Sequence, residues 1–96
     1  MRLLFPLGWS TIFYRASNWT EGLAVTYTVK LPSGVTSSPI TMKDAGDGVY
    51  TAERDFTFEG EFLFIFRENG TKKKMASVDT RRRTGIRYLH KPSIGE

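Results

Sequence analysis

Few side chains in this chain are of the types that carry catalysis or bind metal ions. There is one histidine, His90, and no cysteine, which excludes Cys-ligated zinc and thiol chemistry. His90 stands beside Lys91 and Pro92, whereas a catalytic base needs a nucleophile and an orienting partner at hydrogen-bonding distance. The sequence has no nucleophile-elbow or phosphate-binding-loop pattern. We therefore expect a protein that is not an enzyme and has no catalytic residues.

Three carboxylates, Asp44, Asp47 and Glu68, could bind calcium if their loops met. Their spacing lacks the Asp-x-Asp-x-Asp-Gly progression and the distal glutamate of a calcium-binding hand. Aspartates in a glycine-rich turn commonly accept hydrogen bonds from their own backbone instead, as in an Asx turn. We expect such a turn at 44–48, with no metal ion and no cofactor.

Positive charge is distributed unevenly along the chain. Residues 1–79 contain nine Lys or Arg and nine Asp or Glu, whereas residues 80–96 contain five Lys or Arg and one Glu. The whole net charge of +4 therefore belongs to the last segment. An asymmetry of this kind is typical of an interaction arm.

Apolar side chains accompany the charge at this end, among them Ile86, Tyr88, Leu89 and Ile94. Low hydrophobicity is the mark of disordered segments, so these residues indicate anchors for a partner. The stretch 3–9 is likewise more apolar than an edge strand needs. We expect both ends to contact partner proteins. The predicted contact residues are Leu4, Phe5, Trp9, Arg81, Arg82, Arg83, Ile86, Arg87, Tyr88 and Leu89.

Three interpretations of the basic end remain open. It could be an assembly arm, whose arginines pair with carboxylates of a neighbouring protein. It could bind nucleic-acid phosphates through 81–83 and Arg87, with Tyr88 interleaved. It could also be an unstructured, solubilising tail. A second basic cluster, 72–74, begins the predicted last strand and lies about 25–30 Å from 81–83, at roughly 3.3 Å per residue, so the two clusters do not form one patch. The apolar anchors favour the assembly arm.

The elements that must position these ends all have the pattern of β-strands. Residues 23–31 alternate between apolar and polar side chains, which predicts a half-buried strand. No stretch has a sustained helical period. Turn signals recur at 32–34, 44–48, 58–61 and 68–71, a spacing typical of a sandwich. The predicted strands are 2–6, 10–16, 23–31, 39–43, 49–56, 61–67 and 73–79.

These observations predict one all-β domain over residues 1–79, an immunoglobulin-like sandwich of about seven short strands. An extended basic C-terminal arm, residues 80–96, follows it. The strand at 61–67 differs from the others because Phe62, Phe64 and Phe66 alternate with Leu63 and Ile65. A strand that is apolar on both faces requires cover on both faces.

The apolar start of the chain invites comparison with a signal peptide. It contains Pro6 and Gly8, and no small-residue cleavage site follows it. No apolar run approaches the length that spans a membrane. The lack of cysteine is typical of a reducing compartment. We expect a protein made in a cytoplasm, without contact with a membrane or a small-molecule substrate.

Three motifs together carry a resemblance to a known family. They are the strand ending Tyr27–Gly34, the hairpin entry Asp47–Ala52 and the strand entry Phe58–Phe64. Over residues 22–79 they resemble the Ig-like modules of bacterial and bacteriophage proteins. Phe62 departs from the pattern, since many sandwiches have a tyrosine there whose hydroxyl bonds to the backbone.

The resemblance implies a non-enzymatic bacteriophage virion protein, made in the host cytoplasm. It would serve as a capsid decoration, neck or tail component that contacts other virion proteins in a homo- or hetero-oligomer. The alternative is a small nucleic-acid-binding protein that uses the basic tail. A bacterial adhesin fragment is a third hypothesis, and it would require an export signal.

Overall fold

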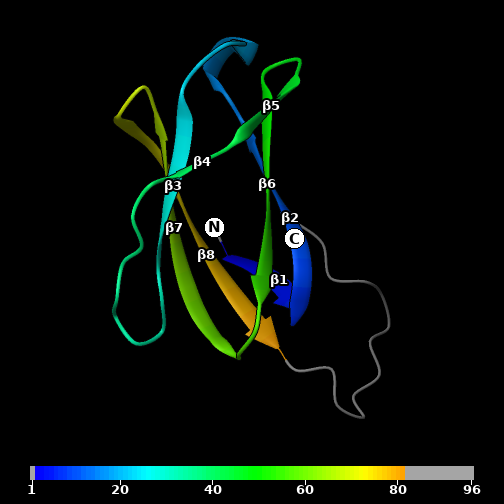
Figure 1. Cartoon of the computed structure of the whole chain (residues 1–96), viewed down its shortest axis with the longest axis vertical. Coiled ribbons are helices and arrows are strands. Elements are labelled where there is room, and N and C mark those ends of the chain that lie inside the picture. Colours follow the sequence, from blue (N-terminus) through cyan, green and yellow to red (C-terminus); the bar gives the residue numbers. More distant parts are fainter. Residues whose placement is uncertain (1, 82–96) are drawn as a thin grey trace.

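The computed structural model describes residues 2–81, which form two β-sheets packed face to face and one short 3-10 turn at Ser17–Trp19. This confirms the predicted all-β sandwich. The five-stranded sheet has the order β1-β8-β7-β3-β4, and the three-stranded sheet has the order β2-β6-β5 (Figure 1). The strands are β1 (Arg2–Pro6), β2 (Gly8–Arg15), β3 (Val25–Lys30), β4 (Ile40–Thr41), β5 (Lys43–Gly46), β6 (Val49–Phe56), β7 (Gly60–Glu68) and β8 (Thr71–Arg81).

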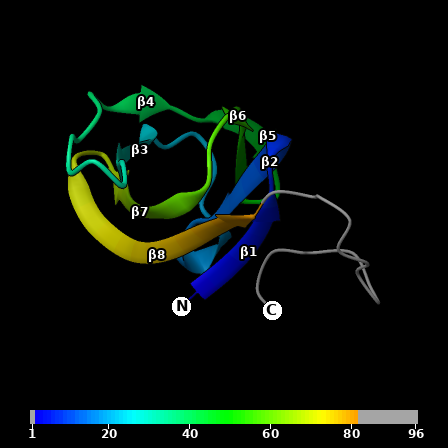
Figure 2. The same cartoon turned by 90° about the horizontal axis from the view of Figure 1, so that it is seen from below.

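The chain crosses between the sheets four times within the described residues, after β1, β2, β4 and β6. Most neighbouring strands run antiparallel, but β1 pairs with β8 in parallel, from Arg2 opposite Ser77 to Pro6 opposite Arg81. Figure 2 shows β1 lying beside β8 at the edge of the larger sheet. A parallel pair needs a long connection, and here the connection is the rest of the domain.

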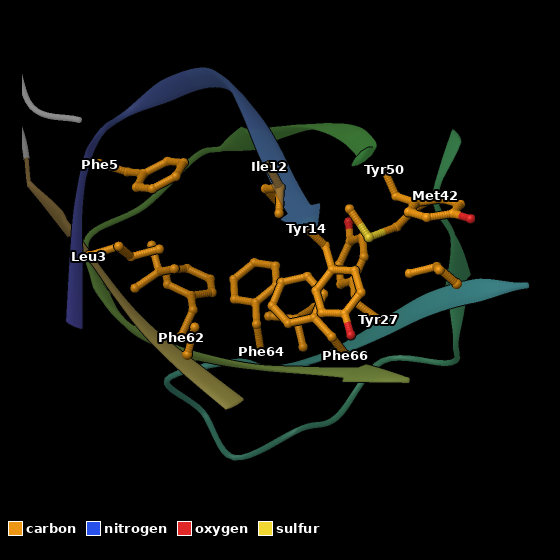
Figure 3. Packing of buried hydrophobic residues seen from close by; sticks show 14 of the residues in the cluster. Leu3, Phe5, Ile12, Tyr14, Tyr27, Met42, Tyr50, Phe62, Phe64 and Phe66 are labelled. Carbon is orange, nitrogen blue, oxygen red and sulfur yellow. The ribbon is translucent and has the colours of Figure 1, made fainter. Parts of the chain in front are cut away.

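Alternate side chains of both sheets fill the space between them, as the period of two requires. Aromatic rings dominate this core (Figure 3), and Phe56 of β6 lies between Phe5 and Phe62 with ring centroids 5.4 and 5.3 Å apart. Both contacts have edge-on geometry, which aromatic pairs favour. The buried apolar residues are Leu3, Phe5, Ile12, Tyr14, Ala16, Val25, Tyr27, Val29, Met42, Tyr50, Phe56, Phe62, Phe64, Phe66, Ala76 and Val78.

The single strand predicted at 39–43 is wrong, because the chain changes sheets within it. Ile40 and Thr41 pair with β3, whereas Lys43 and Asp44 pair with β6. Met42, between them, is buried, and its N–H donates to the carbonyl of Val25 at 2.9 Å. The described residues therefore contain eight strands instead of about seven.

The turn predicted at 44–48 is shorter than expected. Residues 43–46 are strand β5, and only Asp47 and Gly48 form the turn, both with positive φ. The Asn69-Gly70 hairpin is confirmed, with φ of 49° and 86°. Positive φ at both positions is the geometry of a two-residue hairpin turn that matches the strand twist. The last strand begins two residues earlier than predicted and continues two residues past 79, to Arg81.

Strand β7, which is apolar on both faces, is fully covered on only one of them. Phe62, Phe64 and Phe66 are buried between the sheets, whereas Leu63 and Ile65 are only partly buried on the outer face. Cross-strand neighbours flank them there, Lys30 opposite Leu63 and Met75 opposite Ile65.

Thr80 supplies the corner contact that Phe62 cannot make. Its buried hydroxyl donates to the carbonyl of Phe58 and accepts the N–H of Gly60, both at 2.9 Å. These bonds join the connection between β6 and β7 to the last strand. A threonine from β8 therefore closes this corner, where many sandwiches use a tyrosine of the corner itself.

Candidate docking surfaces

The outer face of the three-stranded sheet carries exposed aromatic side chains. Along β2, Ile12 and Tyr14 point into the core, so Trp9 and Phe13 must point outward, and they are 72% and 52% exposed. Large apolar side chains that gather on a surface commonly mark an interaction site. We call this surface the aromatic face. It consists of Trp9, Thr11, Phe13, Arg15, Trp19, Lys43, Thr51, Glu53 and Asp55.

Trp19 extends the aromatic face beyond the end of β2. The guanidinium of Arg15 lies 4.0 Å from the centroid of the Trp19 ring, in a cation–π contact, and the ring remains 57% exposed. Both Asn18 and Trp19 have a φ of 56°, which costs free energy for residues with a Cβ.

Close packing below the loop holds Trp19 in place. A Cβ on Gly48 would lie 2.5 Å from the backbone of Trp19, so only a glycine allows the loop and the hairpin to approach this closely. The N–H of Ala16 also donates to the carbonyl of Gly48 at 2.8 Å. The indole ring of Trp19 is therefore exposed to solvent although the backbone that carries it is tightly packed.

Acidic residues outnumber basic ones in the three-stranded sheet and its loops, and the reverse holds in the rest of the described chain. Segments 8–22 and 43–56, which build the three-stranded sheet and its loops, contain three basic and five acidic residues, among the latter Glu53 and Asp55 on the aromatic face. The other described residues contain seven basic and four acidic residues, including the exposed cluster Lys72–Lys74. On the aromatic face itself, Glu53 and Asp55 lie at the end that carries Trp9, whereas Arg15 and Lys43 lie toward the other end, so the Trp9 end is the acidic one.

An open groove of about 520 Å³ lies on the opposite side of the molecule, against the outer face of the five-stranded sheet. Its walls are the connection after β3 and the neighbouring strands, and its lining mixes apolar and charged groups. The lining residues are Lys30, Leu31, Pro32, Ser33, Gly34, Glu61, Leu63 and Ser77. A cavity of about 30 Å³ between the sheets has room for little more than a water molecule.

A buried hydrogen-bonded group connects the two sheets at one end of the sandwich. Tyr14 of β2 donates its hydroxyl to the carboxylate of Glu68 at the end of β7, and the N–H of Ser17 donates to the same oxygen at 3.1 Å. Tyr14 also stacks on Phe66, with ring centroids 5.2 Å apart. This group has the geometry of a structural link, because one carboxylate oxygen at the end of β7 accepts hydrogen bonds from β2 and from the loop that follows it.

The pKa directions agree with that geometry. Burial, the hydrogen bond to Glu68 and its negative charge raise the pKa of Tyr14. The Tyr14 hydroxyl holds the pKa of Glu68 below its usual range, against the opposing effect of burial, and the Ser17 N–H and the charge of Lys73 add to this lowering. The tyrosine therefore keeps its proton and the glutamate its charge across the neutral range.

Two of the three acidic residues considered for calcium, Asp44 and Glu68, serve separate local roles. Asp44 accepts the N–H groups of Gly46 and Gly22, both at 2.9 Å, which confirms the Asx-type turn and lowers the pKa of Asp44. Glu68 is occupied by Tyr14 and Ser17. Among residues 2–81, no group of three or more His, Cys, Asp or Glu side chains is arranged to hold a metal ion.

The predicted N-terminal contact residues divide between the surface and the core. Leu4 and Trp9 are exposed. Phe5 is buried against Phe56 and forms no part of an exposed surface, because alternation along β1 turns Leu3 and Phe5 inward and Leu4 outward. Leu4 lies on the outer face of the other sheet, so the structure does not bring it together with Trp9.

The predicted contacts at the other end lie mostly beyond the described part of the chain. Arg81 is the last residue of β8, which places it about 30 Å from Lys72, at roughly 3.3 Å per residue, as the sequence predicts. Arg82, Arg83, Ile86, Arg87, Tyr88 and Leu89 lie outside the described residues.

Sequence reasoning missed most of the aromatic face. Trp9 was expected to make contacts, but Phe13, Arg15 and Trp19 were not. The signal for Phe13 was present, since a strand that buries Ile12 and Tyr14 must expose Phe13. The exposure of Trp19 follows from left-handed backbone at Asn18 and Trp19, which no residue type or spacing in the sequence indicates.

No helix within residues 2–81 is long and apolar enough to cross a membrane. No protein-family model matches the sequence, and neither does any curated protein.

Solved structures with a similar fold are parts of much longer chains. A polysaccharide lyase matches 86% of this chain at 26% identity with a TM-score of 0.61. A Bacteroides vulgatus protein assigned as a glycoside hydrolase matches 85% of this chain at 6% identity with a TM-score of 0.60. An alkylpurine DNA glycosylase of Pseudomonas fluorescens, solved bound to DNA containing an abasic-site analogue, matches 82% at 15% identity with a TM-score of 0.53.

This chain spans only 11%, 17% and 27% of those three proteins. The matches support the sandwich fold as a module of larger proteins, and all three proteins are enzymes by name, with no phage protein among them.

Proposed function

We propose that this chain is a non-enzymatic virion structural or accessory protein that acts through protein–protein contacts. The observation that carries the proposal is the aromatic face, where Trp9, Phe13 and Trp19 are each more than half exposed. Aromatic residues are enriched in the cores of protein interfaces, and acidic neighbours such as Glu53 and Asp55 add selectivity for a basic partner.

The wider context supports a docking module. The Ig-like motifs within residues 22–79 resemble modules of bacterial and phage proteins, and the similar solved folds are small parts of larger chains. The lyase and hydrolase activities named for those chains belong to proteins several times longer. A fold shared over so small a part does not carry a reaction with it.

The proposal can be tested in particles of a phage that carries this sequence. A Trp9→Ser, Phe13→Ser double variant should disappear from purified particles while the soluble chain keeps its unfolding midpoint. A Thr57→Ser variant, altered at an exposed connection, serves as the matched control. Absence of the unaltered chain from purified particles would contradict the virion role.

One observation favours a second candidate, a nucleic-acid-binding protein. Lys72, Lys73 and Lys74 are all exposed at the start of β8, next to the hairpin tip. Phosphate contacts of this type weaken steeply as salt increases. Retention of the chain on DNA or RNA at low salt, lost in a K72E/K73E/K74E variant, would favour this candidate, and no retention at low salt would reject it.

A further inference from the structure

The aromatic face lies beside the point where the described chain ends. Pro6 pairs with Arg81, the last residue of β8, and two residues later Gly8 begins β2 opposite Phe56. Trp9 and its cross-strand neighbour Asp55 follow at once. The end of the aromatic face that carries Trp9 is therefore the end from which residue 82 continues.

We propose that residues 82–96 of the same chain bind along the aromatic face. The proposal goes beyond the function proposed above: the segment covers the aromatic face in the free chain, and a docking partner has to displace it. The proposal names an occupant for a surface that the described residues leave open.

Charge complementarity is the first reason for this choice. Residues 82–96 contain four basic side chains and one acidic one. They would meet Glu53 and Asp55, two exposed carboxylates that β6 places beside Thr11 and Trp9. Arginine is also the basic residue best suited to lie flat on an exposed indole ring while pairing with a carboxylate.

Apolar complementarity is the second reason. The segment contains Ile86, Tyr88 and Leu89, which exceed what a solvated tail requires. Trp9 and Phe13 offer them exposed ring surface, and removing apolar area from water is the main favourable contribution to such a contact.

Chain length is the third reason. The eight residues of β2 extend about 27 Å, at roughly 3.4 Å per residue. Fifteen residues can span up to about 50 Å, so the segment can turn at Gly85, the residue type most tolerant of reversal, and still follow the whole strand. A tether this short gives an effective concentration of the order of millimolar, which favours binding within one chain.

Both tryptophans of the chain, Trp9 and Trp19, belong to the aromatic face, so tryptophan fluorescence reports on this surface alone. The experiment measures acrylamide quenching in the full-length chain and in an R82E/R83E/R87E variant. At low salt we expect about two-fold stronger quenching in the variant, because its segment no longer binds. High salt should raise quenching in the unaltered chain toward the level of the variant, since salt screens exposed charges.

Two further variants make the result specific. The matched control, K72E/K73E/K74E, reverses an equal number of charges about 30 Å away along β8, and its quenching should equal that of the unaltered chain. Adding E53K and D55K to the R82E/R83E/R87E variant should restore protection, because the charges of the face and the segment are then exchanged.

The outcomes separate this proposal from the others. Equal quenching in the unaltered chain and in R82E/R83E/R87E would overturn it. Protection that grows with protein concentration would also overturn it, in favour of a second copy as the occupant. Loss of the proposed virion role would leave the quenching result unchanged, so the two proposals fail independently.

Discussion

The two sheets of this sandwich divide stability and surface chemistry between them. The five-stranded sheet places Phe62, Phe64 and Phe66 in the core and keeps Leu63 and Ile65 partly buried on its outer face. The three-stranded sheet buries one side and leaves aromatic and acidic groups on the other. The difference indicates that substitutions in the larger sheet should affect folding, and substitutions on the outside of the smaller sheet should affect binding.

The largest expected effect is in the five-stranded sheet. Phe64 is buried and lies 5.2 Å from Tyr27 and 6.3 Å from Phe56, measured between ring centroids. A Phe64→Ala substitution should lower the free energy of unfolding by about 3–5 kcal/mol, through lost burial and the cavity left behind. Urea denaturation measures this loss. Leu63→Ala, one residue away on the outer face, is the control, and an equal loss there would break the distinction between inner and outer faces.

The next largest effect concerns the link between the sheets. A Tyr14→Phe substitution keeps the ring on Phe66 but removes the hydroxyl that donates to Glu68. A buried carboxylate that loses a donor should cost about 1–3 kcal/mol in the free energy of unfolding. Tyr50→Phe, which removes a hydroxyl bonded to loop backbone at Leu23 and Thr20, is the comparison variant. A stability of Tyr14→Phe equal to that of the unaltered chain would show that the link contributes nothing.

The corner closed by Thr80 should give a smaller loss. Thr80→Val keeps the shape of the side chain but leaves the carbonyl of Phe58 and the N–H of Gly60 without their partner. We expect a loss of about 1–2 kcal/mol in the free energy of unfolding. Thr57→Val, at an exposed position in the same corner, should leave stability within about 0.5 kcal/mol.

The same link between the sheets predicts a pH dependence. The pKa of Glu68 is lower in the folded protein than its ordinary value of 4.5, so its stabilising effect is complete above about pH 4.5 and is lost as the pH falls through the lowered value. Since the Tyr14 hydroxyl is the main cause of that lowering, the difference in stability between the unaltered chain and Tyr14→Phe should narrow on acidification. In alkali, the raised pKa of Tyr14 predicts that stability falls above about pH 10, the ordinary tyrosine value. Urea titrations at a series of pH values test both directions, and a difference that stays constant down to pH 3 would reject the assignment.

The smallest expected effect on stability is on the aromatic face. Trp9→Ser removes a ring that is 72% exposed, so the free energy of unfolding should change by less than about 0.5 kcal/mol. The same variant should lose binding to partners in a pull-down from infected cells. A large loss of stability would show that the ring belongs to the fold and not to a docking surface.

The sequence predicted those parts of the fold in which local pattern and tertiary position agree. Residues 49–56 form the predicted strand, in which Tyr50, Ala52 and Phe56 share the face that packs on the core. The change of sheet at Met42 was not predictable from alternation, because a bend leaves the period of two unchanged. Tyr14 and Glu68 are 54 positions apart in the sequence, and nothing in the residues around either one predicts that their side chains form a hydrogen bond. Of the aromatic face, only Trp9 was predicted, because the exposure of a sheet face depends on which other parts of the fold pack against it.

The parallel pairing of β1 with β8 also bears on how the domain folds. Residue 2 pairs with residue 77, so these contacts close a loop that contains nearly the whole described chain. Contacts between residues so distant in sequence lose the most chain entropy before they stabilise the fold, and they slow folding. We therefore expect β1 to join last, after the antiparallel strands have paired. Until it does, β8 presents an unpaired edge, which makes this the stage at which a folding chain is most exposed to wrong pairing with another chain.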